Sequence, residues 1–158
     1  GQASPTPPIG RITKSTPDGN IEPPFNPLHY ALTAGATFVA RGLSGDIKQL
    51  TEILKAAIQH KGFSFIDVFS PCVTYNKIEG YDFFRKNTYE LKDNNRKDFF
   101  EAFKHASEWG DEPHSIPIGI LYDVDAPVYE DADETLSAYN LKDTAPYKLT
   151  ESDLEEFY

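Results

Sequence analysis

The single cysteine of the chain, Cys72, is the side chain with the most reactive chemistry. It lies in the segment Ser-Pro-Cys-Val-Thr, residues 70–74, directly after a predicted strand. In open α/β sheets, ligands bind beyond the carboxyl ends of parallel strands, and Pro71 restrains the turn that presents the cysteine there. Two interpretations stay open: a small buried hydrophobic residue, or a nucleophile. A nucleophile needs a histidine and an orienting acid nearby, and nothing in the sequence places His60 or His114 beside it.

The histidines and a glycine-containing turn are weaker candidates. No two histidines have a spacing typical of a metal site, so we expect no metal ligand among His29, His60, His105 and His114. The turn Gly-Leu-Ser-Gly-Asp, residues 42–46, could accept an anion at the start of the next helix. Asp46 already places a negative charge there, which favours a plain capped turn.

The charge balance limits the classes of partner. The 158 residues carry 15 basic and 25 acidic side chains, a formal net charge of −10. Such a surface repels phosphate backbones and anionic lipid, so we expect neither nucleic acid nor a membrane surface as a partner. The acidic tail is most simply a solvated surface, although it could also dock a partner; its acids are Glu130, Asp131, Asp133, Glu134, Glu151, Asp153, Glu155 and Glu156.

Length and composition fit one globular domain, with or without a tail, because 39% of the residues are hydrophobic and 13% are aromatic. No apolar run approaches the roughly 20 residues that span a bilayer, and no signal-peptide pattern opens the chain. The chain contains no methionine and opens Gly-Gln-Ala-Ser-Pro. This predicts a processed end or a piece of a longer protein, in the cytoplasm.

The elements that must position Cys72 form a predicted β-α-β unit. The partly β-branched segment 36–41 and the apolar segment 63–69 are typical of buried strands. Between them, apolar residues recur at helical spacing from Ile47 to Ile58, after Asp46 as a cap. Two strands with a helical crossover predict a parallel pair, the repeating unit of a doubly wound sheet.

The segments before this unit have different patterns. Residues 1–27 are rich in proline, with a turn signal at residues 18–20, and predict an extended, irregular arm. Asn26 before Pro27 predicts the start of a short helix that ends near Gly35.

The second half of the chain has a less regular pattern. Residues 77–95 have no clean period, which predicts mostly loop. A helix follows, capped by Asn94 or Asn95 and ending at Trp109, whose expected apolar face is Phe99, Phe100, Phe103, Ala106 and Trp109. Residues 116–122 predict a strand, and Pro117 favours an edge position. A last short helix is expected at residues 152–157.

Two segments together carry a resemblance to a known family. They are Ala-Gly-Ala-Thr-Phe-Val-Ala-Arg-Gly at 34–42 and Phe-Ile-Asp-Val-Phe-Ser-Pro-Cys-Val-Thr-Tyr-Asn at 65–76. The chain resembles the carboxyl-terminal half of the β subunit of 2-oxoacid:ferredoxin oxidoreductases. The opening Gly-Gln-Ala-Ser-Pro-Thr and the strand at 116–122 are similar to further parts of that half.

The resemblance implies an α/β fold: the carboxyl-terminal part of a doubly wound thiamine-diphosphate-binding domain, at 1–76, and a mixed α/β carboxyl-terminal extension, at 77–158. It implies thiamine diphosphate, magnesium and one 4Fe–4S cluster in the intact subunit, with Cys72 as the fourth cluster ligand. It places Gln2 and Ser4 near the thiamine diphosphate. The family's Gly-Asp-Gly…Asn motif and its other three cysteines are absent from these residues, so we expect no cofactor in the isolated chain and assign no catalytic residue.

The implied activity is the oxidative decarboxylation of a 2-oxoacid to acyl-CoA, with electrons passed through the cluster to ferredoxin. The implied partners are the rest of the β subunit, the α subunit, ferredoxin, coenzyme A and the 2-oxoacid. On this interpretation the chain alone is inactive. The alternative is a non-catalytic, acidic α/β module that binds a partner through its arm and tail.

Overall fold

The computed structural model describes residues 4–110, 113–133 and 136. The chain divides into two compact units, Gly1–Ala126 and Pro127–Tyr158. The described part of the second unit contains one short helix, α5 (Tyr129–Ala132). The helix expected at 152–157 lies outside the described residues, and none of the described helices is long and apolar enough to cross a membrane.

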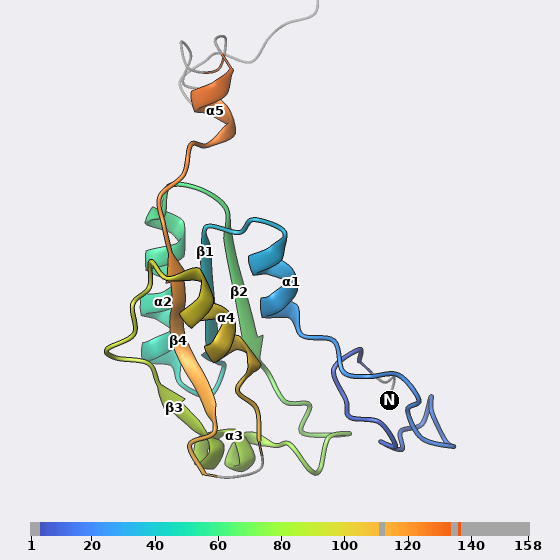
Figure 1. The fold of residues 1–158 in the computed structure, drawn as a ribbon. Coiled ribbons are helices and arrows are strands. Elements are labelled where there is room, and N and C mark those ends of the chain that lie inside the picture. The colour runs from blue at the N-terminus through green and yellow to red at the C-terminus, as the bar shows by residue number, and fades with distance from the viewer. Residues whose placement is uncertain (1–3, 111–112, 134–135, 137–158) are drawn as a thin grey trace, which may run out of the picture. The chain divides into compact units, whose positions relative to one another are not determined.

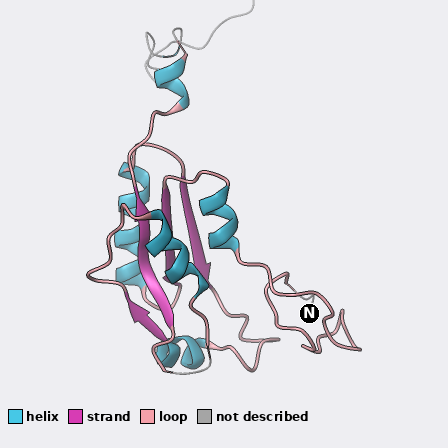
Figure 2. Ribbon diagram, in the orientation of Figure 1, coloured by secondary structure: helices cyan, strands magenta, loops and turns pink. Residues whose placement is uncertain are grey.

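The first unit is built on a four-stranded mixed sheet in the order β2-β1-β4-β3 (Figures 1 and 2). The strands are β1 (Phe38–Leu43), β2 (Ser64–Phe69), β3 (Thr88–Glu90) and β4 (Ile116–Asp123). β1 is parallel to β2 and antiparallel to β4, and β3 is parallel to β4. The α/β class expected from the sequence is therefore confirmed.

The predicted β-α-β unit is also confirmed. Helix α2 (Ile47–Gln59) connects β1 to β2, which pair from Phe38 opposite Ser64 to Leu43 opposite Phe69. The Asp46 side chain accepts a hydrogen bond from the Gln49 backbone N–H at 3.1 Å, so it caps the helix. The turn at 42–46 is thus the capped turn that the sequence favours.

Helices cover both faces of the sheet. α2 contacts β1, β2 and β4, whereas α1 (Pro27–Thr33) and α4 (Phe99–Ser107) lie on the other face and pack on each other (Figure 1). The core is divided in the same way, with Phe38 and Ala40 packed toward α2, and Val39 toward α1 and α4. This division follows from the alternation of side chains along β1.

The edge position expected for the strand at Pro117 is wrong. β4 lies inside the sheet, between β1 and β3. The Ile118 carbonyl accepts from the Leu91 N–H at 2.9 Å, so the neighbouring Pro117 nitrogen faces away from β3. Pairing of β4 with β1 starts only at Gly119, so no ladder hydrogen bond is lost at the proline.

The loop expected at 77–95 is partly wrong as well, because it contains α3 (Tyr81–Asn87) and β3. The predicted helix exists as α4, but Asp98 caps it, and Asn94 instead donates its side-chain N–H to the Ile120 carbonyl at 3.1 Å. Phe100 and Trp109 are exposed. The face of α4 that is fully buried is formed by Ala102 and Ala106.

Candidate functional site

Cys72 lies in a loop, residues 70–80, that leaves the carboxyl end of β2; we call it the Cys72 loop. The cysteine is exposed, so the interpretation as a buried hydrophobic residue is wrong. The loop turns back at once, since the Asn76 N–H donates to the Cys72 carbonyl at 2.9 Å. The Asn76 side-chain oxygen then accepts from the N–H groups of Ile78 and Glu79, at 3.2 and 2.9 Å. These bonds give the loop a defined conformation.

The turn also affects the acidity of the thiol. The backbone N–H of Tyr75, and next that of Thr74, lower the pKa of the Cys72 thiol because they stabilise its ionised form. A thiolate is the form of cysteine that binds metals and attacks electrophiles. The arrangement can therefore supply one exposed sulfur donor.

An unusual buried cation lies in the strands that lead to this loop. Arg41, in the middle of β1, is almost fully buried, and its Nε bonds to Asp67 Oδ2 of β2 at 3.0 Å. The rings of Phe69 and Trp109 lie 5.1 and 5.9 Å from the guanidinium carbon. Burial lowers the pKa of Arg41, while Asp67 opposes the shift. Nη1 is buried and has no hydrogen-bond partner among the described residues.

Sequence reasoning missed this pair, although a signal was present. Arg41 and Asp67 interrupt two apolar strands, and parallel pairing of those strands sets the two residues opposite each other. Opposite charges at matched positions of two predicted neighbouring strands indicate an ion pair across the sheet.

The histidines lie away from Cys72. His60 lies at the amino ends of β1 and β2, where its Nδ1 is 3.0 Å from Asp123 Oδ1 and its Nε2 is 2.9 Å from Thr37 Oγ1. His114 contacts the Thr88 carbonyl at 3.3 Å. The nucleophile, base and acid arrangement is therefore not formed at Cys72.

The remaining histidines make structural contacts on α4. His29 stacks on Phe103 with ring centroids 4.0 Å apart, and His105 Nδ1 lies 2.9 Å from Glu108 Oε1. Within the described residues, no group of three or more histidine, cysteine, aspartate or glutamate side chains could hold a metal ion.

Of the two residues expected near the thiamine diphosphate, one lies in the described part of the chain. Gln2 lies outside the described residues. Ser4 is exposed, and its hydroxyl is 2.8 Å from that of Thr6. Of the acidic tail, the structure describes Glu130, Asp131 and Asp133 in or next to α5.

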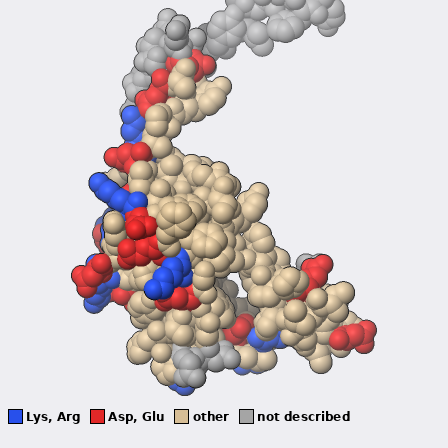
Figure 3. All heavy atoms as spheres, in the orientation of Figure 1, with Lys and Arg blue, Asp and Glu red and all other residues tan. Residues whose placement is uncertain are grey.

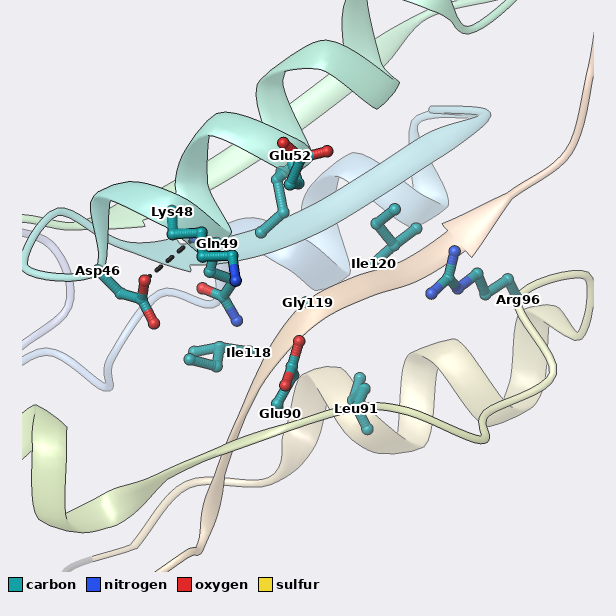
Figure 4. A pocket seen from close by; sticks show the side chains of 11 residues that line it. Asp46, Lys48, Gln49, Glu52, Glu90, Leu91, Arg96, Ile118, Gly119 and Ile120 are labelled. Carbon is teal, nitrogen blue, oxygen red and sulfur yellow. Dashed lines mark hydrogen bonds between the residues drawn. The ribbon is translucent and has the colours of Figure 1, made fainter.

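A cleft lies between α2 and the β3–β4 part of the sheet (Figure 4). Its floor is apolar and includes Ile118 and Ile120, and charged side chains of both signs surround it, among them Glu52, Glu90 and Arg96. No residue of the Cys72 loop lines it, so this cleft is separate from the cysteine site. Helix α1 contains no Lys, Arg, Asp or Glu, and on the face seen in Figure 3 the charged side chains lie over other parts of the molecule.

Comparison with known proteins identifies the class. Residues 2–68 match the family model "Thiamine pyrophosphate enzyme, C-terminal TPP binding domain". Residues 72–138 match the family model for the C-terminal part of the pyruvate ferredoxin oxidoreductase β chain, and Cys72 is the first residue of this match. The fold and the two matches define the class of this chain, which is part of a thiamine-dependent oxidoreductase.

Individual relatives identify the family more closely. The chain is 42% identical to a 2-oxoacid:ferredoxin oxidoreductase subunit beta of Saccharolobus solfataricus over 77% of this chain and 43% of the relative. It is 39% identical to one of a Sulfolobus species, over 97% of this chain and 53% of the relative. The chain belongs to the family of 2-oxoacid:ferredoxin oxidoreductase β subunits, and it spans about half the length of these curated relatives.

A solved structure agrees with this. A 2-oxoglutarate:ferredoxin oxidoreductase from Magnetococcus marinus, with 2-oxoglutarate, coenzyme A and succinyl-CoA bound, superposes with a TM-score of 0.79 at 33% identity. The match covers 99% of this chain and 52% of the other. The resemblance to this family seen in the sequence is therefore confirmed.

Proposed function

We propose that this chain forms part of a β subunit that, with an α subunit, oxidatively decarboxylates a 2-oxoacid to acyl-CoA and passes the electrons through a 4Fe–4S cluster to ferredoxin. The observation that carries the proposal is the exposed Cys72 thiol at the carboxyl end of β2, in a turn that the Asn76 N–H closes on the Cys72 carbonyl. The names of the relatives supply the reaction class.

Cys72 is the residue that we assign to the cluster. Cluster iron is held by cysteine thiolates, and hydrogen bonds to the sulfur tune its potential. Exposure and a lowered thiol pKa both fit this role. Because these 158 residues contain one cysteine, the other thiolates must come from residues that are not among them.

Thiamine diphosphate with magnesium, when bound, supplies the electron sink that lets carbon dioxide leave a 2-oxoacid. The match of residues 2–68 to a thiamine-pyrophosphate-binding domain supports this cofactor. We assign Gln2 and Ser4 to its neighbourhood. The described residues of this segment, β1, α2 and β2 above all, form the scaffold that holds the Cys72 loop at the end of the sheet.

We also propose the division of the chain at residues 76 and 77 into a thiamine-binding part and a carboxyl-terminal extension. The two family models, which meet between residues 68 and 72, support a division near this point. On this proposal the Cys72 loop is the connection between the two parts.

The activity is tested on the purified complex of the intact β subunit and its α subunit. With thiamine diphosphate, magnesium, coenzyme A and ferredoxin, we expect ferredoxin reduction that depends on an added 2-oxoacid, with 2-oxoglutarate and pyruvate compared side by side. A complex that contains no iron and reduces no ferredoxin with any 2-oxoacid would contradict the proposal and favour a non-catalytic, partner-binding module.

The location of the cofactor residues has its own test. Residues 1–158 contain no Gly-Asp-Gly…Asn motif, so we expect no binding of magnesium thiamine diphosphate to this chain alone in a calorimetric titration. Micromolar binding would show that the diphosphate site lies within these residues, contrary to the proposal.

A further inference from the structure

The arm, whose described part is residues 4–26, is irregular but folds back on itself. Gly10 N–H donates to the Asn20 carbonyl at 2.7 Å, and Asn20 N–H donates to the Arg11 carbonyl at 2.9 Å. The chain reverses near Gly19, whose φ of 92° favours glycine. This closed loop carries two cations, Arg11 and Lys14, and both reach the Cys72 loop.

Arg11 makes the first contact. Its Nη2 lies 3.2 Å from Glu79 Oε1, and the two side chains are only 18% and 23% exposed. An ion pair shielded from water to this degree is screened less than a surface pair. For comparison, the Lys55–Glu52 pair on α2 has side chains that are 62% and 67% exposed.

Lys14 makes the second contact. Its Nζ lies 5.2 Å from the centre of the Tyr75 ring, within the range of a cation–π interaction. Tyr75 is also the residue whose backbone N–H does most to lower the pKa of the Cys72 thiol. The arm therefore contacts the loop at Tyr75, in the turn that follows the cysteine, and again at Glu79, whose N–H donates to the Asn76 side chain.

We propose that Arg11 and Lys14 are positioning residues, and that the arm holds the Cys72 loop in the conformation that presents the thiol to the iron–sulfur cluster. This inference rests on the proposed function, since it assumes that Cys72 binds the cluster. The contacts join the segment matched by the thiamine-binding family model to the segment that begins at Cys72. The arm thereby fixes the place of the cluster ligand relative to the thiamine-binding part of the subunit.

The test compares Arg11→Gln, Lys14→Gln and the double variant with Lys55→Gln as the matched control. Amide hydrogen exchange of residues 72–79 is measured first, in the β subunit without its iron. The double variant should exchange roughly tenfold faster in this loop while α2 and β1 stay unchanged. The charge-conserving pair Arg11→Lys and Lys14→Arg should restore most of the protection, and Lys55→Gln should have no effect.

The reduction potential of the cluster, in the complete complex, is the second measurement. Loss of two cations that contact the Cys72 loop disfavours the reduced, more negative cluster. The double variant should therefore shift the potential to a more negative value or lose iron, and Lys55→Gln should match the wild type.

The outcomes separate this inference from the proposed function. Unchanged exchange in the Cys72 loop of the double variant would overturn the positioning role, whatever the cluster does. Faster exchange with unchanged iron content and potential would also overturn it, leaving the arm with only a structural role. A Cys72→Ser complex that keeps all its iron would instead refute the ligand assignment, and with it the proposed function, independently of the exchange result.

Discussion

The two ends of the β1–β2 pair both hold buried polar side chains, but they are completed in different ways. At the amino ends, Thr37 Oγ1 accepts from the Phe63 N–H at 2.9 Å and also contacts His60, which in turn reaches Asp123. Toward the carboxyl ends, in the second half of β1, Arg41 has an ion pair with Asp67 but leaves Nη1 without a partner among the described residues. The exposed Cys72 follows there.

The difference indicates which end is structural and which is functional. A buried histidine side chain whose two ring nitrogens both have partners, as in His60, stabilises the fold. A buried cation with an unpaired N–H donor lowers the stability of the fold. Proteins keep such an unfavourable feature mainly at functional sites. On the proposed function, the carboxyl ends, where open α/β sheets bind their ligands, are the functional side of this sheet.

The largest expected effect comes from breaking the pair at the functional end. Asp67→Asn leaves the Arg41 guanidinium buried without a counter-charge, which should lower the free energy of unfolding by about 3 kcal/mol. Urea unfolding of the chain measures this. Asp82→Asn, whose side chain is 99% exposed in its pair with Arg85, should cost less than about 0.5 kcal/mol.

A double variant sharpens the same comparison. Arg41→Met with Asp67→Asn removes the charge as well as its partner, so most of the lost stability should return. Recovery would show that the ion pair is not needed for stability. A double variant as unstable as Asp67→Asn alone would show that Arg41 itself stabilises the fold. That result would contradict the difference drawn between the two ends of the β1–β2 pair.

A smaller effect is expected at the structural end. Thr37→Val removes the hydroxyl that contacts both His60 and the Phe63 N–H, which should cost about 2 kcal/mol of unfolding free energy. Thr37→Ser keeps the hydroxyl and should stay within about 1 kcal/mol of the wild type. In the complete complex, Thr37→Val should leave iron content unchanged, and a loss of iron would show that the two ends are not separate in function.

The smallest and most concentration-dependent effect concerns the open edge of the sheet. Within the described residues, β2 pairs with β1 alone, and Ile47, Ile58 and Phe63 are largely exposed near it on α2 and before β2. Unpaired edges and exposed apolar side chains promote association. We expect the isolated chain to self-associate in light scattering at micromolar concentration; a sharp 17.7 kDa peak without binding of a hydrophobic dye would contradict this.

The sequence predicts the β-α-β unit because its signals agree with one another. The apolar spacing from Ile47 to Ile58, the Asp46 cap and two apolar strands all favour the same arrangement. α3 and β3 escape prediction because their short, polar and aromatic segments lack a period. The edge position inferred from Pro117 is wrong because β4 lies between β1 and β3. An interior strand can contain this proline because Pro117 precedes the part of β4 that pairs with β1.

The site is predictable to a smaller extent. The position of Cys72 after a parallel strand follows from the sequence, whereas its exposure depends on the turn at residues 72–76. The Thr37–His60–Asp123 contacts join residues 23 and 63 positions apart. No local pattern in the sequence indicates a contact of that kind.

The role of Cys72 has the most direct test. In the intact complex, Cys72→Ser keeps a small polar side chain, but a hydroxyl is a poor ligand for cluster iron. Iron content and visible absorbance of the purified complex are compared with those of wild type and Lys55→Gln. We expect loss of most of the iron and of the cluster absorbance in Cys72→Ser alone; full iron with unchanged absorbance would contradict the assignment of Cys72 as a cluster ligand.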